Sequence, residues 1–247
     1  MERRGLLRTA AAGAGVFAVG SAAGTARAAE PAAAPARAVK RDASNPLRVH
    51  IVLFEGVEEL DYVGPLEVFG GAAKLGKPVQ TTLVTSSGPG RVKGRFGMEV
   101  VVPGAWNPAE ADVLVVPGGG FGQRNSTGVW TEIDKGDLPR ALAAAARPGL
   151  TFFGVCTGVI LLEAAGLVGK RPSTTHHAAQ DYLKGKGADV RPNRVVDDGD
   201  LVCTGGVSSG IDGALWLLER EVGADVAATM ERIMEFERRG TVARTRA

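Results

Sequence analysis

The chain has 247 residues, of which 45% are hydrophobic and 23% are charged, and its formal net charge is +2. This composition is typical of a globular protein with a sizeable core, and it excludes a largely disordered chain, a collagen-like chain and a bundle of membrane helices. Beyond residue 28 the chain carries 25 basic and 26 acidic side chains. Because no basic excess remains, we expect no nucleic acid among its partners.

The first 28 residues have the pattern of an export signal. A basic start precedes an apolar stretch over residues 9–23 and a small-residue exit at residues 26–28. The apolar stretch is shorter than the about 20 residues that a membrane span needs. Residues 3–8 (RRGLLR) resemble the twin-arginine motif. We therefore expect residues 1–28 to be a twin-arginine signal peptide, although a disordered Ala-rich tail is an alternative.

Export implies that the mature protein works in the extracellular, periplasmic or cell-wall space, with no stable membrane insertion once the signal is removed. Residues 29–46 are rich in alanine and proline and have little to bury, which predicts a linker. The folded domain is then expected to span residues 47–240.

The domain begins with a β-branched run at residues 48–54, which is typical of a buried parallel strand. Gly64-Pro65 then indicates the start of a helix, because proline fits the first helical turn. Further strand-like runs follow at residues 82–85, 99–102, 113–116, 151–155 and 201–204, and helix-like runs at 138–146, 159–165, 178–184 and 211–221.

Alternating strands and helices predict an α/β fold with a mostly parallel central sheet and helices on both faces, as in flavodoxin-like proteins. Ligands of such sheets bind beyond the carboxyl ends of the strands. The sequence has no metal-ligand spacing, and we expect neither a metal nor a cofactor.

The most informative segment is residues 154–158 (GVCTG), between a predicted strand and a predicted helix. Its spacing is that of a nucleophile elbow with Cys156 at the centre. A thiolate is favoured there by the positive end of the helix, although a free cysteine can instead pack as a small hydrophobe. We interpret Cys203 as a core residue rather than a disulfide partner. A disulfide would prevent Cys156 from acting as a nucleophile, and a domain with a core of this size does not need a disulfide for stability.

Other candidate residues follow strands at the same edge of the sheet. Gly118, Gly119 and Gly120 come after the run at 113–116, where they form either an oxyanion hole with the Thr157 N–H or a simple turn. Asp61 follows the first strand, where its carboxyl can face the thiol and exchange protons with a substrate, or serve only as a helix N-terminal acid. His176 can orient the cysteine and bind substrate, or act as a polar cap.

Together these motifs resemble the ThiJ/PfpI superfamily, within the class I glutamine amidotransferase-like fold, over residues 47–237. The resemblance rests on Asp61 with the Gly64-Pro65 pair, on residues 117–119, on the Cys156 elbow, and on residues 174–176 and 194–202. It implies a homodimer with a small-molecule substrate.

Within that superfamily, Asp61, Thr157 and residues 204–212 resemble isonitrile hydratases and the amino-terminal domains of AraC-like regulators, and the lack of a basic surface excess disfavours a regulator. The resemblance implies that the Cys156 thiolate attacks an isonitrile while protonated Asp61 donates a proton, and that water then releases an N-formamide. The peptidases of the family have histidine where Thr157 stands, which disfavours a peptidase. Two alternatives remain: a glyoxalase or deglycase acting on small dicarbonyls, and a non-catalytic redox-sensing or protective protein.

Overall fold

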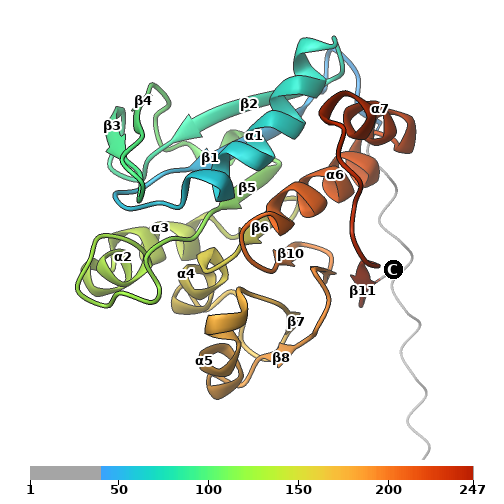
Figure 1. Cartoon of the computed structure of the whole chain (residues 1–247). Coiled ribbons are helices and arrows are strands. Elements are labelled where there is room, and N and C mark those ends of the chain that lie inside the picture. The colour runs from blue at the N-terminus through green and yellow to red at the C-terminus, as the bar shows by residue number, and fades with distance from the viewer. Residues whose placement is uncertain (1–39, 247) are drawn as a thin grey trace, which may run out of the picture. The chain divides into compact units, whose positions relative to one another are not determined.

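The structure is a computed structural model that describes residues 40–246. The predicted signal peptide and residues 29–39 of the predicted linker lie outside this range. A central sheet has the strand order β11-β9-β10-β6-β5-β1-β2 (Figure 1). Its strands are β1 Leu47–Val52, β2 Val79–Val84, β5 Val113–Val116, β6 Thr151–Val155, β9 Val195–Asp197, β10 Leu201–Thr204 and β11 Ala243–Arg244.

Neighbouring strands of this sheet run parallel, except that β9 and β10 form an antiparallel hairpin. The helices are α1 Glu59–Lys74, α2 Val129–Lys135, α3 Asp137–Ala145, α4 Gly158–Ala164, α5 Gln180–Gly185, α6 Ser209–Glu221 and α7 Ala224–Met234, with 3₁₀ turns η1 Pro108–Glu110 and η2 His177–Ala179. The predicted α/β fold with a mostly parallel sheet is confirmed.

Two consecutive residues of β6 show that helices cover both faces of the sheet. A Cβ added at Gly154 would meet Val159 and Leu162 of α4, whereas the Phe153 ring lies against Gly213 of α6. Successive side chains of a strand point to opposite faces. The helices α4 and α6 therefore sandwich β6, and the buried strand residues between them form the core.

The start of the first helix differs from the prediction. The α1 helix begins at Glu59, so Pro65 lies inside it rather than in its first turn. A Cβ at Gly64 would stand 2.9 Å from the Ile211 side chain, and the Pro65 ring lies near Gly210. The Gly64-Pro65 pair therefore serves the close crossing of α1 and α6, and the earlier start places Asp61 on a helix.

The predicted strand at 99–102 forms, but it lies outside the main sheet. It is β4 (Glu99–Val102), which pairs antiparallel with β3 (Gly90–Lys93) in a separate two-stranded ribbon. A second small sheet pairs β7 (Pro172–Ser173) with β8 (Asp189–Val190).

Residues 40–46, which precede the predicted start of the domain at residue 47, contact the folded part of the chain. The Arg41 side chain is only 7% exposed and donates from Nη1 to Asp112 Oδ2 at 3.0 Å, while Nη2 lies 3.6 Å from Glu221 Oε2. Residues 40–46 therefore pack on the domain, because separating the buried Arg41 guanidinium from its carboxylate partners would leave buried charges unpaired.

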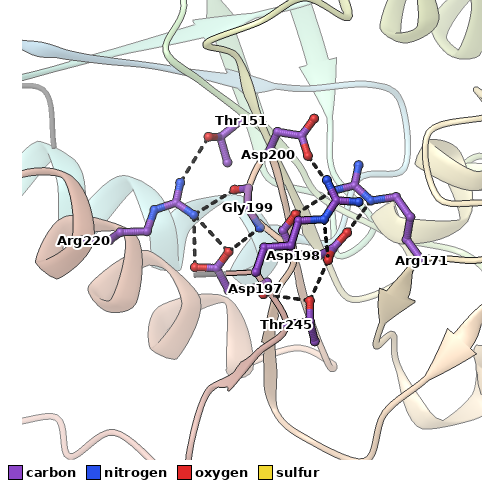
Figure 2. A network of polar contacts seen from close by, with 9 residues as sticks. Thr151, Arg171, Asp197, Asp198, Gly199, Asp200, Arg220 and Thr245 are labelled. Carbon is purple, nitrogen blue, oxygen red and sulfur yellow. Dashed lines mark hydrogen bonds and ion pairs between the residues drawn. The ribbon is translucent and has the colours of Figure 1, made fainter. Parts of the chain in front are cut away.

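Strand β11 follows the predicted end of the domain at residue 240 and adds to the sheet edge beside β9. The hairpin turn between β9 and β10 holds this edge in a polar network (Figure 2). Asp197 accepts from Trp216 and Arg220, and Asp198 accepts from Arg171 and the Thr245 hydroxyl. Within residues 40–246, no helix is long and apolar enough to cross a membrane.

Candidate active site

Cys156 sits at a strained turn between β6 and α4. Its φ is +56°, in the left-handed region that residues other than glycine rarely adopt. The surrounding backbone holds this conformation: the Cys156 N–H donates to the carbonyls of Thr204 and Gly205, and its own carbonyl accepts the Thr175 hydroxyl at 2.7 Å. A strained, over-determined conformation is typical of functional sites. The sharp strand-to-helix turn predicted from the glycine spacing is present.

The glycines on either side of Cys156 allow other chain segments to approach closely. A Cβ at Gly158 would overlap the Val116 carbonyl oxygen at the end of β5. One at Gly154 would stand within 3 Å of the Val159 and Leu162 side chains. The elbow can therefore lie against β5 and α4 only because both positions lack a side chain.

Asp61 lies in the first turn of α1 and is fully buried beside the Cys156 thiol. Its Oδ2 accepts the Gly118 N–H at 2.9 Å. Its Oδ1 accepts no hydrogen bond from the described residues. The structure thus brings together the acid and the thiol that the sequence predicted to face each other, and Oδ1 is the atom left to exchange a proton.

Burial controls the protonation of this pair. Loss of solvent raises the pKa of Asp61 well above its usual value, opposed by the Gly118 hydrogen bond. Burial also raises the pKa of the Cys156 thiol, and the neighbouring Asp61 charge raises it further. Desolvation of Cys156, which is only 5% exposed, therefore opposes the thiolate that the sequence analysis expects to be favoured at the helix end.

The structure corrects the role of Gly118 and Gly119. The Gly118 N–H is engaged by Asp61, and the Gly119 N–H donates to the Thr157 hydroxyl at 3.0 Å. These two donors therefore fix the acid and the elbow instead of forming an open oxyanion hole. Gly120 continues the turn at a φ of +72°. The Thr157 N–H faces the Cys156 sulfur and lowers the pKa of that thiol.

Glu58, the residue immediately before α1, was not singled out as a site residue. Its N–H donates to the Gly118 carbonyl at 2.8 Å, and its carboxylate lies 3.7 Å from Arg95 Nε on the β3–β4 hairpin. The negative charge of Glu58 raises the pKa of both Asp61 and Cys156. Its position three residues before Asp61, one helical turn away, is the signal that could have found it.

His176 takes the capping role that was its alternative. Its Nδ1 accepts the Ala178 N–H at 3.2 Å at the start of η2, and its ring lies against Gly206. The residue of this segment that contacts the Cys156 backbone is its neighbour Thr175.

Cys203 is a core residue, as predicted. It is fully buried in β10, where it pairs with Gly154, and burial raises the pKa of its thiol to about 12. Both cysteines are free.

Comparisons with known proteins show which sequences and structures the chain is similar to. The sequence model of the DJ-1/PfpI family matches residues 47–220. The chain is 34% identical over 192 residues to the isonitrile hydratase of Pseudomonas putida, covering 77% of this chain and 78% of that protein. It is 27% identical over 181 residues to a deglycase of Pyrococcus abyssi, covering 71% and 96%.

Among solved structures, a ThiJ/PfpI family protein from Pseudomonas syringae superposes with a TM-score of 0.69 at 23% identity, covering 87% of this chain and 85% of that one. That likeness shows the fold, and the family match spans more than half of the sequence. The chain therefore belongs to the DJ-1/PfpI family.

Proposed function

We propose that the protein is a cysteine-dependent hydro-lyase that adds water to an isonitrile to give an N-formamide. The observation that carries this proposal is the contact of a buried thiol, held at positive φ, with a buried carboxyl whose pKa burial raises well above its usual value. An isonitrile carbon must gain both a nucleophile and a proton, and this pair supplies both at one point.

The reactive form of the pair holds one proton, on Asp61, and leaves Cys156 as the thiolate. The sulfur bonds to the terminal carbon of R–N≡C while the Asp61 proton moves to that carbon, which gives the thioimidate R–N=CH–S–Cys156. The Asp61 carboxylate then takes a proton from water as the water oxygen adds to the same carbon. The other proton of that water moves to nitrogen, the C–S bond breaks, and R–NH–CHO leaves.

One feature of the site and one sequence comparison support this assignment. Asp61 Oδ1 is free of partners among the described residues, so it can serve as acid and then as base. The relative with the matching activity is 34% identical over most of the chain. We further propose that the enzyme acts as a homodimer, outside the cytoplasm, after twin-arginine export of the folded domain.

A deglycase is the second candidate, because the Pyrococcus abyssi deglycase is matched over 96% of its length. The redox-sensing alternative finds less support, because oxidation needs an exposed thiol with a low pKa and Cys156 is buried with a raised one.

The test incubates the purified mature protein with an alkyl isonitrile, a glycated thiol formed from methylglyoxal, and peroxide in parallel. We expect the N-formamide to appear in the first arm, followed by its formyl proton in NMR spectra. The Cys156→Ala variant should form none, and Cys203→Ala serves as the matched control. Turnover of the glycated thiol alone would favour the deglycase, and inertness toward both substrates would refute catalysis.

A further inference from the structure

A polar pocket lies beside the elbow on the carboxyl edge of the sheet. It has a volume of about 300 Å³ and is lined by side chains and backbone from η2, the loop before β9 and the loop before α6. We call it the His–Arg pocket; the lining residues used below are Thr175, His176, His177, Arg194, Gly205 and Gly206.

Arg194 is the one formally charged side chain among the described residues that line the His–Arg pocket. Arg194 and two histidines contribute to its wall, and no aspartate or glutamate does. Arg194 pairs with the buried Asp212, which accepts from Arg194 Nε and Nη2 at 3.1 and 2.6 Å. Asp212 therefore fixes the guanidinium in place.

The second amino group of that guanidinium remains available. Arg194 Nη1 donates to no acceptor among residues 40–246, and the side chain is 31% exposed. A planar, pre-oriented guanidinium with a free N–H edge is well suited to bind a carboxylate.

His176 presents a second donor to the same space. Because its Nδ1 accepts the Ala178 N–H, the proton of the neutral ring is on Nε2. The ring lies directly against Gly206, where an added Cβ would overlap it, and stacks on His177 at 4.2 Å between centroids. The ring is thus held by three contacts with its Nε2–H as a fixed donor.

The residues that hold the Cys156 backbone are also part of the pocket wall. Thr175, which precedes His176, donates its hydroxyl to the Cys156 carbonyl, and Gly205, which precedes Gly206, accepts the Cys156 N–H. Both Thr175 and Gly205 also line the pocket. The pocket therefore shares two of its lining residues with the backbone contacts that hold Cys156 in place.

We propose that the His–Arg pocket binds an anionic substituent of the substrate, so that the preferred substrate carries a carboxylate beside its reactive group. The assignment of that reactive group as an isonitrile rests on the proposed function above. The pocket itself binds anions through Arg194 and His176, whatever the reactive group is.

The test compares two formamides that the enzyme does not turn over. N-formylglycine carries a carboxylate, whereas N-formylglycinamide is neutral and of the same size. Binding to the full mature protein is followed by calorimetry and by the NMR shifts of His176. We expect N-formylglycine to bind at least about tenfold more tightly, which is the scale of one charge-assisted hydrogen bond. Equal affinities, or no binding of either compound, would overturn the proposal.

Two variants locate the binding site. His176→Asn keeps an acceptor for the Ala178 N–H and loses the Nε2–H, and Arg194→Met removes the guanidinium. Each should reduce N-formylglycine affinity about tenfold and leave N-formylglycinamide unaffected. Arg191→Met is the matched control, since Arg191 is on the same loop but pairs with Asp189 outside the pocket. Should Arg194→Met unfold because Asp212 is left unpaired, the Arg194→Met/Asp212→Asn double variant replaces it.

These binding measurements are independent of turnover. An unchanged affinity in both pocket variants would place the anion elsewhere and refute the His–Arg pocket, even if isonitriles are hydrated. Selective anion binding without isonitrile hydration would uphold the pocket and refute only the proposed reaction.

Discussion

The Gly118 N–H donates to Asp61 Oδ2 at 2.9 Å, which joins the glycine turn after β5 to the acid on α1. Asp61 Oδ1 accepts no hydrogen bond from another backbone or side-chain group of the described residues. The glycine turn thus orients the Asp61 carboxyl. Burial raises the pKa of both this carboxyl and the Cys156 thiol.

The first prediction concerns the pH dependence of turnover. Because burial raises the pKa of both Asp61 and Cys156, the pair carries two protons at low pH and one in an intermediate range. Only the singly protonated pair contains both a nucleophile and an acid. We therefore expect a bell-shaped profile of kcat/KM whose acid limb lies above the usual aspartate pKa of 3.8. A rate that is flat from pH 4 to 10 would contradict the shared-proton mechanism.

The Asp61→Asn substitution should lower the activity and raise the stability of the protein. Asparagine can still accept the Gly118 N–H, but it cannot donate or take a proton. Turnover should fall by about 10²- to 10⁴-fold. An unimpaired variant would remove Asp61 from the mechanism.

The same substitution should make the protein more stable. The folded-state pKa of Asp61 is above the unfolded value, so its stabilising contribution is complete below the unfolded pKa and is lost as pH rises through the folded pKa. Asparagine does not titrate. The Tm of Asp61→Asn minus that of the wild type should therefore increase between pH 4 and pH 8, as thermal unfolding at a series of pH values would show.

Cys156→Gly and Cys156→Ala should both abolish covalent turnover but differ in stability. Alanine keeps a Cβ at a φ of +56°, whereas glycine adopts this conformation freely. The glycine variant should therefore be more stable by about 1 kcal/mol. Urea unfolding of the two variants measures the difference. An alanine variant that is as stable as the glycine variant would show that the turn is unstrained.

Gly158→Ala should destabilise the protein, because the added methyl group overlaps the Val116 carbonyl oxygen. The expected cost is about 1–3 kcal/mol, with loss of the alignment between elbow and acid. Gly185→Ala in α5 is the control, since nothing lies within 4 Å of the added Cβ. Equal stability of the two variants would mean that the elbow can move away from β5 without cost.

Arg41→Met tests the revised start of the domain. The substitution removes the hydrogen bond to Asp112 and the ion pair with Glu221 from a side chain that is 7% exposed. We expect a loss of about 1.5–3 kcal/mol, the scale of hydrogen bonds to charged groups. Arg124→Met, which breaks an exposed ion pair with Asp134, should change stability by less than about 1 kcal/mol. If both variants unfold at the same urea concentration, residues 40–46 do not contribute to the domain.

Local patterns in the sequence were sufficient to predict the architecture and the elbow. Strands β5, β6 and β10 lie where their β-branched and aromatic runs predict them, because a strand buried on both faces must be continuously apolar. Cys156 was identified because a sharp turn needs glycine on both sides, a requirement that is written within five residues. Contacts between side chains on different helices and strands were harder to predict from these local patterns.

What the sequence by itself determined is the sheet, the turn that carries Cys156 and the placement of Asp61 at the same edge. What only the tertiary structure decided is how these groups are protonated and bonded. The Gly118 N–H is taken by Asp61, Arg41 is bound by carboxylates about 70 and 180 residues away in the chain, and desolvation holds protons on both reacting groups. Hydrogen-bond partners and dielectric environment depend on distances between segments far apart in sequence, and local residue patterns do not encode those distances.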